Sequence, residues 1–141
     1  MQFIPSTEIK VSVLPEQRPW VCSPDMIRRL VQREDTIAFD IWEEKQLVGF
    51  AMLRKFQEGE WFLWEYMIAG EQQGRGYGRK ALRELIRLMK TQYGMHTMTT
   101  TYIWGHAVAA RLYESLGFEQ TDVVDEPDCH EVNMVLHCPQ E

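Results

Sequence analysis

The sequence predicts an α/β domain built around a mixed sheet, on three observations. Segments of strand and helix character alternate along the 141 residues. Three strand-like segments between residues 36 and 68 follow one another with only short turns between them, which is typical of an antiparallel meander. A glycine-rich loop at residues 74–78 then joins the last of these strands to an amphipathic helix. No repeat or linker interrupts this order, so residues 1–141 are expected to form a single domain.

The first strand and the first helix are expected near the N-terminal end. Residues 9–14 alternate polar and apolar side chains, as a half-buried strand does, and Pro15 ends the alternation. A helix should begin after Ser23, because Ser caps helix N-termini and Pro24 suits the first helical position. Apolar side chains then recur on one face of that helix, at Met26, Ile27, Leu30 and Val31.

The central strands are expected at residues 36–42, 47–54 and 61–68. Glu44-Lys45 and Glu58-Gly59 supply the short turns between them. Because both turns are tight, consecutive strands should pair antiparallel.

The C-terminal half should add two helices and three strands. The helix after the glycine loop should end near Gly94, and a strand is expected at residues 97–103. The next helix, at residues 107–116, should end at Gly117, since glycine suits a left-handed C-terminal cap. Two final strands are expected near residues 118–124 and 131–137. The first of these helices buries one face, at Ala81, Leu82, Leu85, Ile86 and Met89.

Composition excludes several classes of protein. The formal net charge of −6 argues against nucleic acid as a partner, because phosphate binding needs a basic face. No apolar run approaches the ~18 residues of a membrane span, and the N-terminal residues lack the pattern of a signal peptide, so a cytoplasmic location is expected. Cys22, Cys129 and Cys138 are too few for a disulfide framework.

The most informative segment is residues 73–79, Gln-Gly-Arg-Gly-Tyr-Gly-Arg, between a strand and a helix. N–H groups at a helix N-terminus are unpaired and carry partial positive charge, and glycines let a diphosphate approach them closely. Arg75 and Arg79 would add positive charge at the rim. A dinucleotide fingerprint or a P-loop would need glycine in place of Arg79, so neither motif is present. For this segment alone, a glycine-rich turn without a ligand is the alternative.

Two motifs with characteristic spacing lie in this half of the chain. Gln73, Gly76 and Gly78 match Q/R-x-x-G-x-G/A, and residues 106–118 are similar to N-x-x-A-x-x-L-Y-E-x-x-G-F. Together they resemble the hallmarks of the GNAT superfamily of acetyl-coenzyme A-dependent acetyltransferases, over nearly the whole chain. The resemblance implies the GNAT fold, a mixed and mostly antiparallel sheet of about six or seven strands with about four helices. It also implies acetyl-coenzyme A (acetyl-CoA) as co-substrate.

The resemblance carries roles to individual residues. Tyr113 corresponds to the usual general acid, which protonates the coenzyme A thiolate as it leaves. His106 stands where the family usually has an Asn that contacts the pantetheine; a His can donate a similar hydrogen bond, but it is bulkier and can titrate. The expected cofactor-binding residues are Met67 and Ile68 through their main chain, then Gln73, Gly74, Arg75, Gly76, Tyr77, Gly78, Arg79, His106 and Tyr113.

Several shorter segments resemble one branch within this superfamily. They are residues 15–17, 20–21, 47–50, 66–68, 73–78 and 113–118. They resemble the bacterial spermine/spermidine acetyltransferase branch, in which an Asp follows the Met-Ile pair; here that position is Ala69. The branch implies a polyamine as one candidate acceptor, although ancestry does not determine a substrate.

The general base has two candidates, Glu65 and a water-mediated route. Glu65 is the only carboxylate well inside the strand before the glycine loop, where the family usually carries its base. Regular alternation would place Phe62, Trp64 and Tyr66 on one face and Glu65 on the other. The family's common base positions fall on Phe62 and Trp64. Glu65 therefore points away from the expected site unless a β-bulge shifts the alternation.

The sequence thus predicts an enzyme that moves an acetyl group from acetyl-CoA to a primary amine of a small cationic molecule. Two alternatives stay open: a protein Lys or N-terminal amine acetyltransferase, and a catalytically silent acetyl-CoA-binding regulatory module. The pairs Cys129-His130 and His137-Cys138 are about seven residues apart on a strand, roughly 23 Å, too far for one ion, so no metal site is expected. Family members often dimerise, which makes a homodimer one option.

Overall fold

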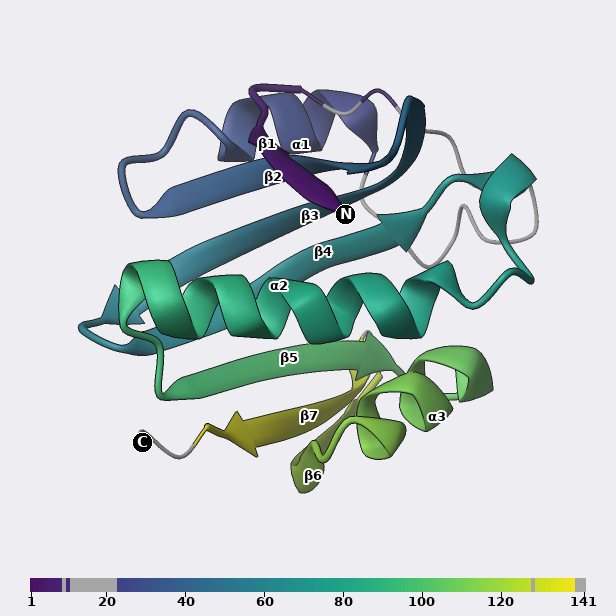
Figure 1. Cartoon of the computed structure of the whole chain (residues 1–141). Coiled ribbons are helices and arrows are strands. Elements are labelled where there is room, and N and C mark those ends of the chain that lie inside the picture. The colour runs from purple at the N-terminus through teal and green to yellow at the C-terminus, as the bar shows by residue number, and fades with distance from the viewer. Residues whose placement is uncertain (9, 11–22, 128, 139–141) are drawn as a thin grey trace.

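The computed structural model describes residues 1–8, 10, 23–127 and 129–138. Within them, seven strands form one sheet in the order β1-β2-β3-β4-β5-β7-β6 (Figure 1). The strands are β1 Gln2–Pro5, β2 Thr36–Glu43, β3 Gln46–Gln57, β4 Glu60–Ile68, β5 Thr97–Ile103, β6 Glu119–Glu126 and β7 Cys129–His137. The helices are α1 Pro24–Leu30, α2 Tyr77–Tyr93, α3 Ala107–Ser115 and the short 3-10 helix η2 Gly70–Gln72.

The predicted α/β fold with a mixed sheet is confirmed. β2, β3 and β4 pair antiparallel in chain order, as the short turns predict, and β4 and β5 form a parallel pair. The helix count differs slightly from expectation, since the described residues contain three α-helices and η2 rather than about four helices. β1 was not expected; it is a short edge strand that owes its conformation to pairing with β2. The strand expected at residues 9–14 lies outside the described residues.

The predicted helix ends agree with the structure. At the start of α1, the hydroxyl of Ser23 accepts a hydrogen bond from the main-chain N–H of Met26, at 3.2 Å. α2 ends at Gly94 in the left-handed conformation, with φ of 64°. The left-handed residue after α3 is Gly117, with φ of 99°. Among the described helices, none is both long and apolar enough to cross a membrane.

The helices cover opposite faces of the sheet. Ile27 of α1 packs against Phe50, Met52 and Met67 on one face, here called the α1 face. α2 and α3 pack on the other face, the α2 face, over the larger part of the core. In Figure 1, α2 and α3 lie in front of the sheet and α1 lies behind it.

A β-bulge interrupts β4 at Trp64. Leu63 pairs with Leu53 of β3, and Glu65 pairs with Met52, so two steps along β4 match one step along β3. An extra residue of this kind shifts the alternation of side chains by one position. Because directly paired residues share a face, Glu65 lies with Met52 on the α1 face.

Because of the bulge, the side chains of β4 do not follow the regular alternation that was expected from the sequence. Before it, Trp61 and Leu63 pack into the core under α2; after it, Tyr66 and Ile68 do so. Trp64 packs on the α1 face. The expectation that Tyr66 shares a face with Trp64 is therefore wrong, and the exception considered for Glu65, a bulge that resets the register, is what occurs.

Candidate active site

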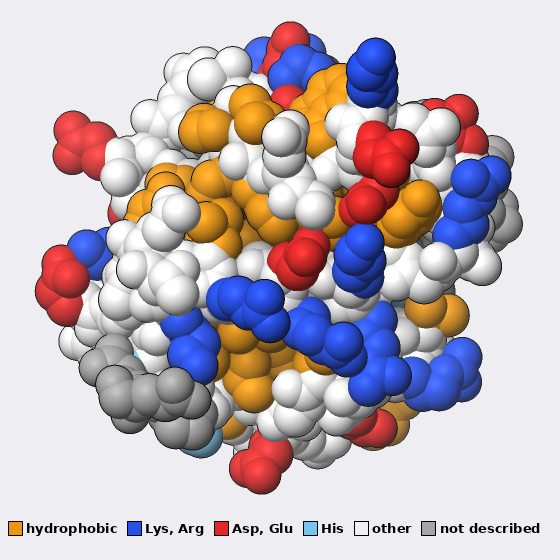
Figure 2. Space-filling model, in the orientation of Figure 1, with side chains coloured by type: hydrophobic (Ala, Val, Ile, Leu, Met, Phe, Trp, Pro, Cys, Tyr) orange, Lys and Arg blue, Asp and Glu red, His pale blue; other side chains and the backbone are white. Residues whose placement is uncertain are grey.

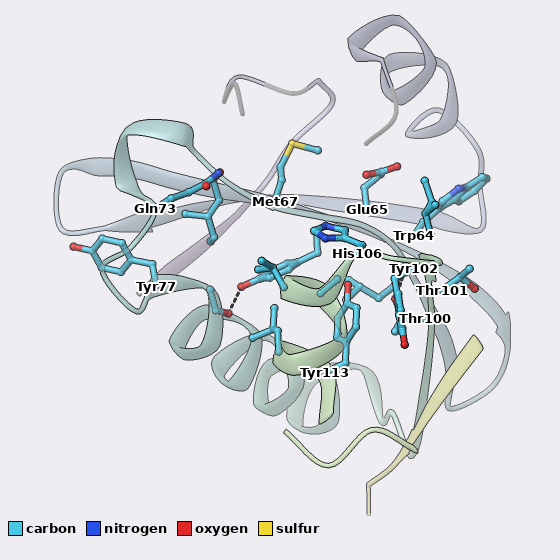
Figure 3. A pocket seen from close by; sticks show the side chains of 18 of the residues that line it. Trp64, Glu65, Met67, Gln73, Tyr77, Thr100, Thr101, Tyr102, His106 and Tyr113 are labelled. Carbon is cyan, nitrogen blue, oxygen red and sulfur yellow. Dashed lines mark hydrogen bonds between the residues drawn. The ribbon is translucent and has the colours of Figure 1, made fainter. Parts of the chain in front are cut away.

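A cavity of about 580 Å³ opens where β4 and β5 stop pairing. Their parallel pairing covers only Glu60 to Leu63 of β4 and Thr97 to Thr100 of β5. Beyond those residues the cavity lies between the two strands, with the start of α2 on one side and the start of α3 on another. Figure 3 shows that Glu65, Met67, Gln73, His106 and Tyr113 all lie around this space, although they come from distant parts of the chain.

The glycine loop forms one end of the cavity. Gly76 is the N-cap of α2, with φ of 80°, and no side chain caps the helix. Gly74 also has positive φ, at 79°, and a Cβ built on Gly74 or Gly76 would meet no atom within 4 Å. The first N–H groups of α2 have no partner inside the helix, so they are available to an anion in this open space.

Gly78 differs from Gly74 and Gly76, because its backbone conformation does not require glycine. It does not have positive φ, and a Cβ there would lie 3.8 Å from Cγ1 of Ile68, an ordinary contact. Neither backbone conformation nor packing within the described chain requires glycine at this position. A ligand that approaches the helix closely would require it.

Two side chains hold the loop to the end of β4. The phenol of Tyr66 donates a hydrogen bond of 2.5 Å to the main-chain carbonyl of Gly78. The side-chain amide of Gln73 donates to the carbonyl of Ile68, at 3.0 Å. Burial raises the pKa of Tyr66 well above its ordinary value, so the phenol remains a donor. The expected role of Gln73 in cofactor binding therefore includes positioning the loop.

Gln72 places a buried acceptor in the cavity wall. Its side chain is 7% exposed, and among the described atoms its Oε1 has no hydrogen-bond partner. A buried acceptor without a partner costs about 1–3 kcal/mol, so it suits a ligand that brings an N–H donor. The pantetheine arm of coenzyme A carries amide N–H groups of this kind.

The other expected cofactor-binding residues divide into two groups. Met67, Ile68 and Tyr77 line the cavity, whereas Arg75 and Arg79 are exposed beside it. The carbonyl of Met67 is turned towards β3, since a Cβ on Gly49 would lie 2.7 Å from it. The main-chain contacts expected of Met67 and Ile68 remain predictions.

Tyr113 of α3 reaches the cavity from the α2 face and is 7% exposed. Burial raises the pKa of its phenol above 10.0, a hydrogen bond with the Thr100 side chain lowers it in part, and the negative charge of Glu65 raises it. Thr100 is itself anchored, because its hydroxyl donates to the carbonyl of Leu63 at 3.1 Å. A phenol with a raised pKa stays protonated at neutral pH and can act as a proton donor.

Glu65 reaches the cavity from the α1 face and is 9% exposed. Figure 3 shows Glu65 and Tyr113 around the same space, and the charge of Glu65 makes a small contribution to the raised pKa of the Tyr113 phenol. A phenol and a carboxyl group on opposite sides of one cavity can exchange protons with a molecule bound between them.

His106 is the N-cap of α3, and its ring lies in the cavity between Met67 and Tyr113 (Figure 3). Burial lowers the pKa of its imidazole below 6.5, so the ring is neutral at pH 7. A neutral imidazole has one N–H donor. The side-chain amide of Asn, the residue usual in the family at this position, is also a hydrogen-bond donor.

The cavity residues that were not expected from the sequence include Tyr66, as the residue that holds the glycine loop, Gln72, Thr100 and Glu131. Gln72 could have been noticed because it precedes the glycine motif. The other three give no local signal, since each owes its place to pairing between distant strands or to the packing of α2 on β4.

Comparisons with known proteins agree with this geometry. The profile of the Acetyltransferase (GNAT) family matches residues 7–118. The spermine/spermidine N(1)-acetyltransferase of Bacillus subtilis strain 168 is 30% identical over 92 residues, which are 60% of this chain and 60% of that protein. An uncharacterized N-acetyltransferase of the same strain, YycN, is 27% identical over 84 residues, 57% of this chain and 53% of that protein. The chain thus matches somewhat over half the length of these relatives.

Solved structures share the fold. A mutant of the spermidine N-acetyltransferase from Vibrio cholerae superposes with a TM-score of 0.70 at 20% identity, over 82% of this chain and 75% of that one. A structure described as the Vibrio cholerae enzyme in complex with CoA and spermine gives a TM-score of 0.68 at 18% identity, over 83% and 76% of the two chains. Another is described as dodecameric, with a TM-score of 0.68 at 18% identity over 86% and 82% of the chains.

Proposed function

Because the chain belongs to the Acetyltransferase (GNAT) family, we propose that it transfers the acetyl group of acetyl-CoA to a primary amine of a small cationic molecule. One observation carries the proposal: Tyr113 and Glu65 approach the same cavity from opposite faces of the sheet, and an uncapped helix N-terminus lies at its end.

The residues of the cavity suit acetyl-CoA. Bound there, it would supply an acetyl thioester. The open space before Gly74 and Gly76, together with the N–H groups that begin α2, suits its diphosphate. The unpartnered Oε1 of Gln72 suits an amide N–H of the pantetheine arm, and the ring of His106 lines the same cavity. With charged acceptors each main-chain hydrogen bond contributes about 1.5–3 kcal/mol.

The acceptor amine must lose a proton before it can attack. An alkylammonium group has a pKa near 10.4, so making it neutral at pH 7 costs about 4–5 kcal/mol. Glu65 lines the cavity from the α1 face and can take this proton, directly or through water. A positioned base of this kind typically accelerates a reaction by about 10²- to 10⁴-fold.

On the α2 face, Tyr113 is suited to protonate the leaving group, the coenzyme A thiolate. As the amine nitrogen bonds to the carbonyl carbon and the carbon–sulfur bond breaks, the sulfur takes the electron pair. Tyr113 then gives its phenolic proton to the thiolate. The raised pKa of Tyr113 keeps that proton available, and the hydrogen bond with Thr100 orients the phenol.

A polyamine is the acceptor class that best fits the charges. Of the described residues that line the cavity, Glu65 and Glu131 are acidic and none is Lys or Arg. A wall of this charge attracts a cation and disfavours acidic amino acids. The spermine/spermidine acetyltransferase among the relatives supports the same choice.

Thiol release tests the proposal. The purified protein would be incubated with acetyl-CoA and a panel of polyamines, aminoglycosides, amino acids and peptides, and free coenzyme A measured. We expect the fastest release with polyamines. Release with peptides alone would favour a protein acetyltransferase. Tight binding of coenzyme A by calorimetry without release from any amine would favour a regulatory module.

A further inference from the structure

The cavity has a second carboxylate, Glu131, to which the proposed chemistry assigns no step. Glu131 lies on β7 directly opposite Ile103 of β5 and is partly buried. Its neighbour Val132 is buried in the core under α2. Because neighbouring residues of a strand point to opposite faces, Glu131 is turned to the α1 face, where Glu65 also lies.

The charges around Glu131 make it suited to a cation. Among the described residues, no Lys, Arg or His forms an ion pair with it. The neighbouring His130 pairs instead with Asp125, at 2.7 Å. His106, the remaining basic side chain on the described part of the cavity wall, is neutral at pH 7 because its pKa is lowered. A partly buried carboxylate in such a wall is stabilised when a ligand supplies the opposite charge.

The two carboxylates are set apart by the topology of the sheet. Glu65 is on β4 and Glu131 on β7, and β5 runs between these strands. Neighbouring strands lie about 4.8 Å apart, so the two backbones are separated by about 10 Å, or more where β4 and β5 diverge. One ammonium group cannot bond both carboxylates at this separation, but the two ends of an elongated cation can.

Apolar side chains flank the two carboxylates. Trp64 packs on the α1 face beside Glu65. Ile103 shares that face with Glu131, because the two residues are directly paired. Both side chains line the cavity. Apolar and aromatic side chains in the cavity wall beside the two carboxylates match the methylene groups that separate two ammonium groups.

We infer that Glu131 binds the second ammonium group of a diamine or polyamine acceptor, while the reacting amine lies between Glu65 and Tyr113. The assignment rests on the proposed function and adds to it a specificity determinant. A monoamine of the same chain length would leave Glu131 without a counter-charge and would be acetylated less efficiently.

Steady-state thiol release with a matched pair of acceptors tests the assignment. Wild type and Glu131→Gln would be compared on 1,4-diaminobutane and butylamine at saturating acetyl-CoA. We expect wild type to prefer the diamine by about tenfold or more in kcat/KM. Glu131→Gln should lower kcat/KM for the diamine by about tenfold to hundredfold and that for butylamine by a clearly smaller factor, because the monoamine loses only the general attraction of the wall.

Glu126→Gln is the matched control, because it removes the same charge from an exposed position of the β6–β7 hairpin that does not line the cavity. It should leave both values within about twofold. Thermal unfolding would establish that each variant is folded. The preference of wild type is an independent measurement that needs no variant.

The outcomes separate the two proposals. Equal kcat/KM for diamine and monoamine in wild type, or equal losses for both in Glu131→Gln, overturns the role of Glu131 and leaves amine acetylation intact. Failure of wild type to acetylate either amine, or any other in the panel, overturns the proposed function and this assignment with it.

Discussion

At the scale of single residues, the proposed chemistry depends on the protonation state of Tyr113 and on the position of Glu65 in the cavity. Tyr113 is held protonated by burial and by the nearby negative charge of Glu65, while Thr100 offsets part of that effect. Glu65 is held at the cavity by a bulge rather than by regular strand geometry. Because the charge of Glu65 contributes to the raised pKa of Tyr113, removing the Glu65 side chain should shift the pKa of the phenol that remains.

Replacing Tyr113 by Phe should lower kcat for acetyl transfer by about 10²- to 10⁴-fold, since the proposed general acid is lost. Coenzyme A binding measured by calorimetry should change little. The unfolding free energy should fall by about 0.5–1.5 kcal/mol, because the hydrogen bond with Thr100 is removed.

The control for that variant is Tyr93→Phe, at an exposed position near the end of α2 that does not line the cavity. It should keep the wild-type kcat. Unchanged acetyl transfer in Tyr113→Phe would mean that another donor protonates the thiolate.

At the scale of secondary structure, the start of α2 has a sequence that favours binding over helix stability. Glycine occupies both the N-cap and the second helical position, and the first turn contains no acidic residue. An acidic residue there would stabilise the helix but compete with an anionic ligand. The cost to the helix is offset in part by Tyr66, whose phenol bonds the carbonyl of Gly78.

Gly78→Ala should therefore separate stability from binding. The variant should be as stable as wild type or up to about 1 kcal/mol more stable, because alanine favours the helix and its Cβ meets only an ordinary contact. Its affinity for coenzyme A should fall about tenfold, because the methyl group occupies the space before the first N–H groups. Chemical unfolding and calorimetry measure the two effects. Unchanged affinity would show that the diphosphate does not approach Gly78.

Hydrogen-bonded ion pairs around Asp35 connect the segment between α1 and β2 to β3. The Asp35 carboxylate accepts hydrogen bonds from Arg33, at 3.1 Å, and from Arg54 of β3, at 2.9 Å. The guanidinium groups of both arginines lie 5.9 Å from the centre of the Trp64 ring. This cluster therefore joins the turn before β2 to the bulged residue beside the cavity.

The same cluster predicts a pH effect. The hydrogen bonds from Arg33 and Arg54 lower the pKa of Asp35 from 3.8 to about 2. The folded state thus binds fewer protons than the unfolded state in this range, and the stabilisation is present above pH 3.8 and lost as the pH falls towards 2. Asp35→Asn should be less stable than wild type at neutral pH, and the difference should shrink between those pH values.

Urea unfolding at several pH values measures that difference. Asp25→Asn, which alters an exposed carboxylate beside Arg28, is the control and should show a smaller effect. A constant difference between wild type and Asp35→Asn down to pH 2 would contradict the assignment.

At the scale of the whole molecule, charge is segregated. Figure 2 shows a row of Lys and Arg side chains across the face on which α2 lies, and the exposed Arg79, Arg83 and Arg87 belong to that helix. The net charge is nevertheless −6, so the remaining surface is more acidic than the average suggests. The glycine-loop end of the cavity therefore lies near positive charge, and the end lined by Glu65 and Glu131 is negative.

This distribution should steer cationic acceptors to the cavity. We expect kcat/KM for a triamine to fall about threefold or more as ionic strength rises from about 0.01 to 0.15 M, because the Debye length contracts from about 30 to 8 Å. The slope for a monoamine of similar length should be shallower. Steady-state assays in added sodium chloride measure both slopes, and equal slopes would argue against steering by the field of the protein.

Local patterns in the sequence determined most of the fold. Turn residues defined the meander, Ser23 and Gly94 marked helix ends, and the glycine loop and the α3 motif pointed to an acetyl-CoA site with Tyr113 within it. These features depend on interactions between residues close in the chain, so a local pattern is enough to reveal them.

Only the tertiary structure decided which side chains meet at the cavity. The bulge at Trp64 turns Glu65 to the α1 face, and the pairing of β7 with β5 places Glu131 on the same face, two strands away. β1 likewise exists through its pairing with β2. A shift of one residue in strand register reverses the face of every side chain beyond it. That register is set by the packing of distant segments, which no local pattern records.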